Sequence, residues 1–302
     1  VASACGGGSD STAPDTTTES DSGTEPEEET AEPEPTPEGE AEAEEPADDN
    51  PLDALRVPQD FATIQEAVDA AEPGDLVLID EGVYNESVVV ETDNIVIRGV
   101  DRQTVVLDGE HSEEMANGII VFSNGVAVEN LTVKNYFSNG VFFTGDYDSD
   151  FILRGYRVSY VNALNNRVYG IYAFNAEYGL FDNTYAAGHT DSGYYIGQCQ
   201  PCNAMLSNNL SEYNTLAYSG TNAGGDLFIV NNEFRMNRIG VTPNTLNSEE
   251  LAPQRGATFA GNWIHSNGNP DTPKGGDIWE LAYGVGMVLP GANNNLVSRN
   301  LI

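Results

Sequence analysis

Short runs of alternating apolar residues recur from about residue 118 to residue 302, and asparagine separates them. Four segments align directly, each with one Asn, four intervening residues and a second Asn: 129–135, 208–214, 231–237 and 261–267. Asn183 and Asn300 occupy the first position in two more copies and Gly155 replaces it in another, which gives intervals of 23 to 30 residues until the last, of 38. Units this short bury an apolar face only by stacking on one another, which predicts a solenoid.

The runs between the asparagines have the period of β-strands, as in Val126, Val128, Leu131 and Val133. Three short strands with their turns fit one interval. Asparagine tolerates the left-handed backbone region, and its side-chain amide both donates and accepts hydrogen bonds, so stacked asparagines predict a ladder along the solenoid. The predicted ladder positions are Asn130, Asn183, Asn209, Asn232, Asn262 and Asn300.

Four strand-like runs open on glycine, at 118–121, 140–143, 170–173 and 193–196. With the spacing and the Asn corners, these openings resemble the right-handed parallel β-helix repeat proteins of the pectate-lyase-like superfamily, over residues 55–302. The resemblance implies an all-β fold, a right-handed parallel β-helix with three sheets. That superfamily contains lyases, hydrolases, epimerases, esterases and proteins without a known reaction, so the resemblance leaves the activity open.

Residues 55–71 predict a short amphipathic helix that covers the first coil of the solenoid. Thr63 and Glu66 are spaced as a capping box, and Pro73-Gly74 ends the segment. Its apolar positions fall on one helical face: Phe61, Ile64, Val68 and Ala71. The run from residue 55 to residue 90 resembles the opening of many β-helix and pectin-methylesterase-like proteins.

The first fifty residues contain 17 Asp and Glu and no Lys or Arg, among many Pro, Thr, Ser, Gly and Ala. Such a segment has little to bury and repels itself, which predicts a disordered tether over residues 6–54. The start of the chain, residues 1–5, resembles the end of a bacterial lipoprotein signal peptide with Cys5 as the lipidated residue. This resemblance implies a protein anchored outside the cytoplasmic membrane. The last repeat stops at Ile302 without a capping element, so we expect further residues beyond it.

The remaining residues carry 48 − 17 = 31 acidic side chains against 12 basic ones, a net charge of −19. This excess argues against nucleic acid as a partner, because nucleic-acid binding depends on neutralising phosphates. It also argues against tight binding of a polyanionic polysaccharide unless a cation intervenes. No apolar run has the length of a membrane span. The oligomeric state is not indicated by any pattern.

Cys199 and Cys202 are the other two of the three cysteines. No second cysteine pair completes a zinc site, and the pair lies between strand-like runs rather than at the start of a helix. In an oxidising compartment this spacing favours a local disulfide at a corner of the coil.

Aligning the Gly-led runs divides their side chains between the core and the outer face. The inward set is Ile119, Val141, Ile171, Tyr194 and Val285, and the outward set is Ile120, Phe142, Tyr172 and Tyr195. Phe142, Tyr172 and Tyr195 would form an aromatic row suited to stacking on sugar rings. A covering loop or a shift of one residue would bury the row instead. Longer insertions at 243–255 and 268–279 would form the walls of a groove.

Asp146, Asp148 and Asp150 alternate as in the first half of a calcium loop, which makes calcium the candidate cofactor. Phe151 stands where that loop has glycine, and Arg157 where it has glutamate, so a solvated acidic turn is the alternative. For acid or base chemistry the candidates are His189 and Asp191, with Asp182, Asp226 and His265 behind them. The arginine arrangement of pectate lyases and the paired-aspartate signature of polygalacturonases are absent.

Three hypotheses follow. The first is an anchored extracytoplasmic β-helix that binds polysaccharide on the aromatic sheet, and cleaves or epimerises it if it is an enzyme. The second is a non-catalytic surface or adhesion module that makes protein contacts. The third is a periplasmic factor for copper-enzyme maturation, against which the scarcity of His, Met and Cys argues.

Overall fold

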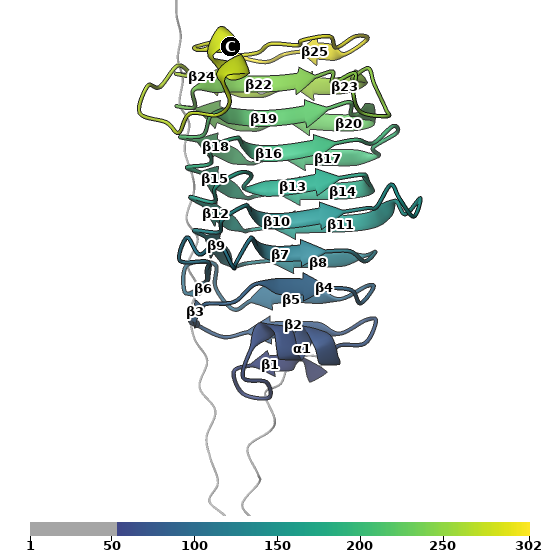
Figure 1. Cartoon of the computed structure of the whole chain (residues 1–302), viewed down its shortest axis with the longest axis vertical. Coiled ribbons are helices and arrows are strands. Elements are labelled where there is room, and N and C mark those ends of the chain that lie inside the picture. Colours follow the sequence, from purple (N-terminus) through teal and green to yellow (C-terminus); the bar gives the residue numbers. More distant parts are fainter. Residues whose placement is uncertain (1–52) are drawn as a thin grey trace, which may run out of the picture. The chain divides into compact units, whose positions relative to one another are not determined.

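Residues 53–302 of the computed structural model are described here. Their strands form three parallel sheets, because each coil of the chain contributes one short strand to each sheet and pairs with the coils before and after it (Figure 1). All named strand pairs are parallel, and their partners lie one coil apart in the sequence. This arrangement confirms the predicted parallel β-helix.

The elements are as follows. In spatial order, the ten-stranded sheet consists of β1 (Leu55–Val57), β2 (Leu76–Ile79), β5 (Val96–Gly99), β8 (Val126–Glu129), β11 (Leu153–Ser159), β14 (Ala176–Asp182), β17 (Ala204–Ser207), β20 (Gly224–Val230), β23 (Arg255–Ala260) and β25 (Leu296–Ser298). The seven-stranded sheet consists of β4 (Val88–Val90), β7 (Asn117–Val121), β10 (Asn139–Thr144), β13 (Ile171–Phe174), β16 (Ser192–Gly197), β19 (Leu216–Thr221) and β22 (Ile239–Asn244). The eight-stranded sheet consists of β3 (Gly82–Tyr84), β6 (Val105–Asp108), β9 (Thr132–Lys134), β12 (Asn162–Leu164), β15 (Tyr185–Ala187), β18 (Leu210–Glu212), β21 (Glu233–Arg235) and β24 (Trp263–His265). The helices are α1 (Ile64–Ala70) and the 3-10 helix η2 (Asp277–Ala282).

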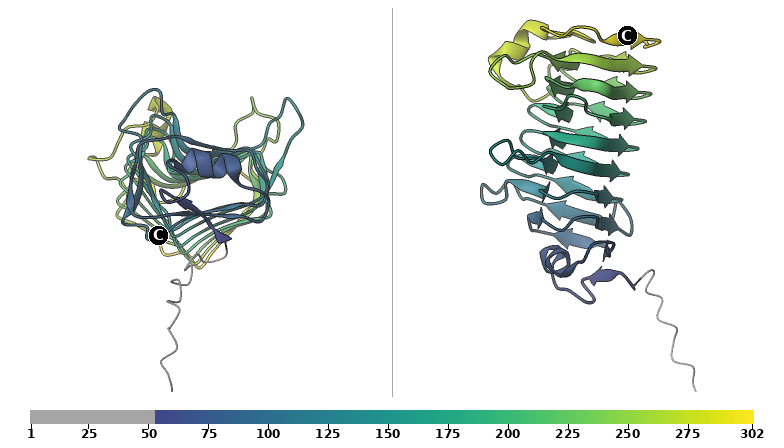
Figure 2. Two further views of the ribbon diagram at one scale, coloured as in Figure 1. Left: turned by 90° about the horizontal axis from the view of Figure 1, so that it is seen from below. Right: turned by 90° about the vertical axis from the view of Figure 1, so that its right-hand side faces the viewer.

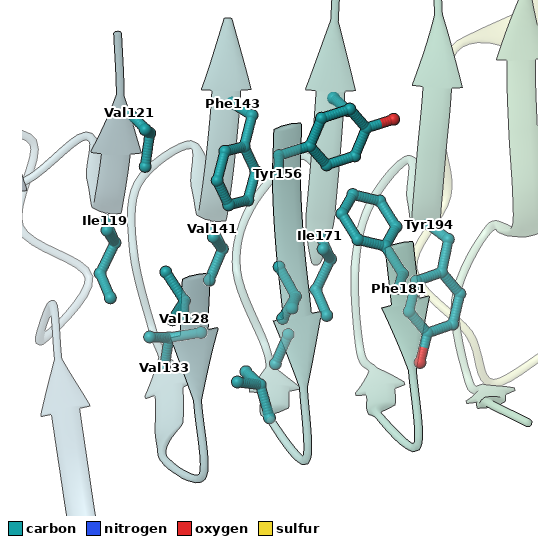
Figure 3. Packing of buried hydrophobic residues seen from close by; sticks show 14 of the residues in the cluster. Ile119, Val121, Val128, Val133, Val141, Phe143, Tyr156, Ile171, Phe181 and Tyr194 are labelled. Carbon is teal, nitrogen blue, oxygen red and sulfur yellow. The ribbon is translucent and has the colours of Figure 1, made fainter. Parts of the chain in front are cut away.

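The core runs along the inside of the coils, where alternate side chains of all three sheets meet. Figure 3 shows this packing between β7 and β10 of the seven-stranded sheet and their neighbours. Ile119, Val141, Ile171 and Tyr194 pair in register and are fully buried, as the alternation predicts. The apolar area buried between successive coils is what stabilises a repeat that could not fold alone.

The glycines that recur at the starts of strands in the seven-stranded sheet have a steric cause. A Cβ atom at Gly140 would lie 2.6 Å from the carbonyl oxygen of Gly170, and one at Gly170 would lie 2.5 Å from that of Gly193. Any larger residue would therefore push two coils apart at this corner. The strand pairing also shows that the prediction of Val285 as a core residue of this column was wrong. Val241 pairs with Met287, so Gly286 rather than Gly284 continues the glycine column, and Val285 is only partly buried.

Helix α1 lies at the first coil, at the end of the stack seen from below in Figure 2. Its capping box is formed as predicted, since the Thr63 hydroxyl accepts from the Glu66 backbone and the Glu66 carboxylate accepts from the Thr63 backbone. The Glu86 carboxylate, from the loop before β4, accepts the backbone N–H groups of Ile64 and Gln65, both at 3.0 Å. The buried face of α1 covers residues that would otherwise meet water.

The asparagine ladder exists, but the sequence alignment merged two adjacent columns. In the ladder, the Oδ1 atoms of Asn209, Asn232, Asn262 and Asn300 accept the backbone N–H one coil earlier at 2.9 to 3.0 Å. Asn130 and Asn183 belong to the neighbouring column, whose members have φ near +55° at the corner. Tyr160, not Gly155, fills the intervening position of that column, as the pairing of Ser159 with Glu129 and Asp182 requires.

Cys5 and residues 6–52 of the predicted tether lie outside the described residues. None of the helices in residues 53–302 has the length and apolar character needed to cross a membrane.

Candidate functional site

Aromatic side chains form a continuous cluster on the outer face of the seven-stranded sheet. Phe142, Tyr172 and Tyr195 occupy one register column, as the Gly-led alignment predicts. The rings of Phe142 and Tyr172 are stacked, with centroids 4.3 Å apart and planes 3° apart, and the ring of Tyr195 meets that of Tyr172 edge-on at 4.8 Å. Tyr169, directly before Gly170, adds a fourth ring, 4.5 Å from Tyr172 and 5.1 Å from Tyr195.

Three rings of this cluster, Tyr169, Tyr172 and Tyr195, line a cleft, and Phe142 stacks on Tyr172 beside it. The cleft has a volume of about 620 Å³ and extends from Tyr169 and Tyr172 across β16 and β19 to β22. Only 5% of Tyr195 is exposed, because segments from later coils cover it, so the expectation of an open ring at this position was wrong. Phe142 and Tyr172 remain partly exposed.

The half of the cleft over β19 and β22 is polar. Its floor is formed by Ser219, Thr221, Thr242 and Asn244. The Thr221 hydroxyl donates to the Asn244 side chain at 3.0 Å, and the Asn244 amide donates to the Ser219 hydroxyl at 3.3 Å. The Thr242 hydroxyl is buried and has no hydrogen-bond partner among residues 53–302. A buried hydroxyl without a partner is costly, so this atom marks a place for a polar ligand group or water.

One wall of the cleft is the insertion after β22, which supplies Thr245, Leu246 and Glu249. The Asn222 side chain fastens it to the coil beneath, donating to the Leu246 carbonyl at 2.8 Å and accepting from the Leu246 N–H at 3.1 Å. The Gln198 side-chain amide donates to the Glu249 carboxylate. Both anchors are corner residues with positive φ, directly after strands of the seven-stranded sheet.

The opposite wall is η2 with the segment after it, including Trp279, Leu281, Ala282, Val288 and Pro290. Arg238 holds η2 through a bidentate pair with Glu280, from Nε to Oε1 at 2.7 Å and from Nη2 to Oε2 at 2.8 Å. Arg238 also lies over the ring of Tyr283, 4.7 Å from its centroid. The predicted walls, 243–255 and 268–279, therefore do border the cleft, and the second extends farther than its predicted end.

Two carboxyl groups line the cleft. Burial raises the pKa of the Asp191 carboxyl, against the opposing effect of a hydrogen bond from the Ser192 hydroxyl at 2.7 Å. Burial likewise raises the pKa of Glu249, opposed by the Asn222 amide. Burial also raises the pKa of the phenols of Tyr169, Tyr172 and Tyr195, so these stay protonated hydrogen-bond donors. Carboxyl groups with raised pKa values in a cleft are suited to proton transfer.

His189, the partner expected for Asp191, lies inside the coil and not in the cleft. It is fully buried, and its Nδ1 and Nε2 atoms lie 3.0 and 3.1 Å from the carbonyl oxygens of Asn166 and Ala163. Burial lowers the pKa of His189 to about 4. The backbone of His189 donates to the Asn214 side chain, which places the residue in a second asparagine ladder. His189, a candidate for acid or base chemistry, therefore does not line the cleft with Asp191.

The predicted calcium loop does not form. The Asp146 carboxylate instead accepts from the Asp148 backbone at 2.9 Å and the Ser149 hydroxyl at 2.7 Å, and these bonds lower its pKa. Asp148 and Asp150 are exposed on the same turn. No group of three His, Cys, Asp or Glu within residues 53–302 could hold a metal ion. The acidic turn, the alternative given above, is what the structure shows.

The remaining candidates lie elsewhere. Cys199 and Cys202 are joined by a disulfide at the corner after β16, as predicted. Asp182 and Asp226 belong to the ten-stranded sheet. His265, on the eight-stranded sheet, stacks on Trp263 at 3.9 Å and pairs with Glu233 at 3.1 Å. None of these three polar residues lines the cleft.

Comparison with solved structures places this architecture in a known class. The chain superposes on the mannuronan C-5 epimerase AlgE4 A-module of Azotobacter vinelandii with a TM-score of 0.56 and 16% identity, covering 80% of this chain and 72% of that one. It superposes on the periplasmic alginate epimerase AlgG with a TM-score of 0.53 and 14% identity, covering 82% of this chain and 54% of that one. The sequence matches no protein-family model and no curated protein.

At these identities the likeness establishes the fold. The chain is a right-handed parallel β-helix with a walled cleft on one of its three sheets.

Proposed function

We propose that this protein binds a polysaccharide in the cleft on its seven-stranded sheet. The observation that carries the proposal is the combination of three clustered tyrosine rings with a hydroxyl and amide floor in one walled cleft. Sugar rings are apolar on their faces and polar at their edges, so they match both halves. The two epimerases described above are named for mannuronan and alginate, which are polysaccharides. This supports a polysaccharide as the ligand class.

The cleft also suits a chain-like ligand. Tyr172, Tyr195, Ser219 and Thr242 follow one another in register across four adjacent strands. At a strand spacing of about 4.8 Å, this row is about 14 Å long. A polysaccharide would lie along the axis of the solenoid, with its first residues on the rings and its later residues over the hydroxyl groups.

Asp191 and Glu249 make cleavage of the bound chain the catalytic form of this proposal. A protonated carboxyl can donate to the oxygen of a glycosidic bond, and a second carboxylate can act as base or nucleophile. Epimerisation and elimination require removal of a proton next to a sugar carboxylate, with positive charge to stabilise the product anion. No Lys, Arg or His lines the cleft in the described residues. Hydrolysis therefore fits the lining better than the other two reactions do.

The experiment is a glycan array followed by calorimetric titration of the best ligand. Tyr172→Ala should weaken binding about fivefold, because the loss of a stacking ring costs about 1 kcal/mol. The matched control is Phe228→Ala, which removes a partly exposed aromatic ring from β20 on another sheet. An array without any bound glycan, or equal losses in both variants, would contradict the proposal.

The non-catalytic form of the proposal is tested on the same ligand. Asp191→Asn should abolish release of reducing ends while keeping affinity within about threefold if the protein is a hydrolase. If the wild type releases none, the protein is a binding module. The disulfide favours an extracytoplasmic location, because such bonds persist in oxidising compartments. Lipidation of Cys5 stays a prediction, to be checked by mass spectrometry of the membrane-extracted protein.

A further inference from the structure

We infer that the cleft selects an uncharged glycan and excludes polyuronates and sulfated chains. This inference rests on the proposed function and specifies its ligand class. Three features of the cleft support it: the charge of the lining, the ion pair that already engages the neighbouring arginine, and the polar groups of the floor.

The lining carries negative charge only. Among the cleft residues of the described chain, Asp191 and Glu249 are ionisable acids and none is a cation. Each carboxyl has already lost solvation, and a sugar carboxylate placed beside it would add repulsion at reduced dielectric. A site made for a polyanion supplies Arg or Lys at the anion instead.

The arginine that anchors the η2 wall does not compensate. Arg238, behind the η2 wall, uses Nε and Nη2 in its bidentate pair with Glu280 and presents its plane to Tyr283. No three His, Cys, Asp or Glu side chains of the described residues converge to hold a bridging metal ion. The Asp191 carboxylate accepts a hydrogen bond from Ser192, and the Glu249 carboxylate accepts from Gln198 and Asn222. A polyanion would therefore enter the cleft without a counter-charge.

The polar floor of the cleft is suited to the hydroxyl groups of a ligand. The Thr242 hydroxyl is buried without a partner, and the neighbouring Ser219 hydroxyl and Asn244 amide offer both donors and acceptors. A sugar hydroxyl can donate and accept at once, and so satisfies such a mixed surface, whereas a carboxylate can only accept. The phenols of Tyr169 and Tyr172 add donors beside the rings.

The test compares pairs of oligosaccharides that differ only in charge: oligomers of mannuronate and galacturonate, and the same oligomers with each carboxylate chemically reduced to a hydroxymethyl group. Binding is measured by calorimetry with a chelator present, at low and at physiological salt. We expect at least tenfold tighter binding of the reduced, neutral member of a pair, with little dependence on salt. Asp191→Asn combined with Glu249→Gln should reduce this preference to less than threefold.

The outcomes separate the two proposals. Equal or tighter binding of the uronate form would overturn the inference and leave polysaccharide binding intact. If the preference for the neutral form persists in the double variant, repulsion by Asp191 and Glu249 is not its cause, and that part of the inference is overturned. Binding of no oligosaccharide, in the test or on the glycan array, would overturn the proposed function and the inference together. Circular dichroism and the melting temperature show whether the double variant is folded before its affinities are compared.

Discussion

His189 stands in a column where the stacked residues of the following coils, Asn214, Asn237 and Asn267, are asparagine. Each of these amides donates to a carbonyl three positions earlier in the preceding coil, and His189 Nε2 occupies the equivalent place beside Ala163. The neutral ring can donate from only one nitrogen, so Nδ1 then faces the carbonyl oxygen of Asn166 without a proton to share. Burial nevertheless keeps the ring neutral at pH 7.

This position predicts an acid-dependent loss of stability. Because burial lowers the pKa of His189 from 6.5 to about 4, the unfolded state binds the proton first as pH falls. Its full contribution is present above about pH 6.5 and is lost as pH approaches 4, which amounts to about 3 kcal/mol. Denaturant unfolding between pH 7 and 4 should show a shallower decline for His189→Asn. The control is exposed His111→Asn, and a wild-type slope in the His189 variant would refute the assignment.

At the scale of the element, the ladder shows what spacing alone predicts and what it does not. The period of the asparagines was enough to predict coils, three strands in each coil and an amide ladder. It could not assign each asparagine to its column, because Asn208-Asn209 and Asn231-Asn232 are adjacent pairs in which one residue turns the corner and the other joins the ladder. A shift of one residue therefore left Asn130 and Asn183 in the wrong column.

The ladder should have a large effect on stability. Asn232 accepts from the backbone and side chain of Asn209 at 3.0 Å and donates to the Leu206 carbonyl at 2.9 Å. Asn232→Ala removes the acceptor of the Asn209 backbone N–H and a donor to the Leu206 carbonyl, while the Asn209 side chain keeps its bond to the Phe181 carbonyl. The substitution should lower the free energy of unfolding by about 2–4 kcal/mol. Asn247→Ala, on an exposed loop, is the control and should change it by less than about 0.5 kcal/mol. Urea denaturation of both variants measures the difference, and similar values would contradict the role of the ladder.

The site was predictable in part. Register gave the aromatic column, since Phe142, Tyr172 and Tyr195 are each the second residue after a column glycine. The walls of the cleft around Tyr195 include Glu249 and η2, which lie 50 or more residues after Tyr195 in the sequence. The insertions at 243–255 and 268–279 predicted the walls, but no local pattern shows which of their side chains enter the cleft. Tyr169 could have been included in the predicted aromatic cluster, because it directly precedes Gly170 and so lies next to the strand that carries Tyr172.

The η2 wall gives a prediction for binding. Arg238→Gln removes the bidentate pair with Glu280 and should let Trp279 and Leu281 move away from the cleft. We expect about tenfold weaker glycan binding, measured by calorimetry, with a small change in melting temperature, since Glu280 is left in contact with solvent. Arg154→Gln, which breaks the exposed pair with Glu177 on the ten-stranded sheet, should leave the affinity unchanged. Equal affinities in the two variants would show that the wall does not need its anchor.

At the scale of the whole molecule, the charge of the β-helix is far from balanced. Of the 31 acidic residues after residue 50, seven carboxylates pair with Lys or Arg in the described residues. The others repel one another over the surface of the stack. Salt weakens both the eight ion pairs that these seven carboxylates form and the general repulsion, and the repulsive interactions are the more numerous. The unfolded chain spreads the same charges farther apart, so the folded state gains more from screening.

Added salt should therefore stabilise the protein. Raising sodium chloride from about 0.02 M to 0.5 M shortens the screening length from about 20 Å to about 4 Å, and should raise the melting temperature by about 2–4 °C, equivalent to about 1 kcal/mol. Sucrose at matched osmolality serves as the uncharged control and separates screening from solute exclusion. A melting temperature that stays constant or falls with salt would mean that the eight ion pairs outweigh the general repulsion. In that case the acidic surface would not be a source of instability at low ionic strength.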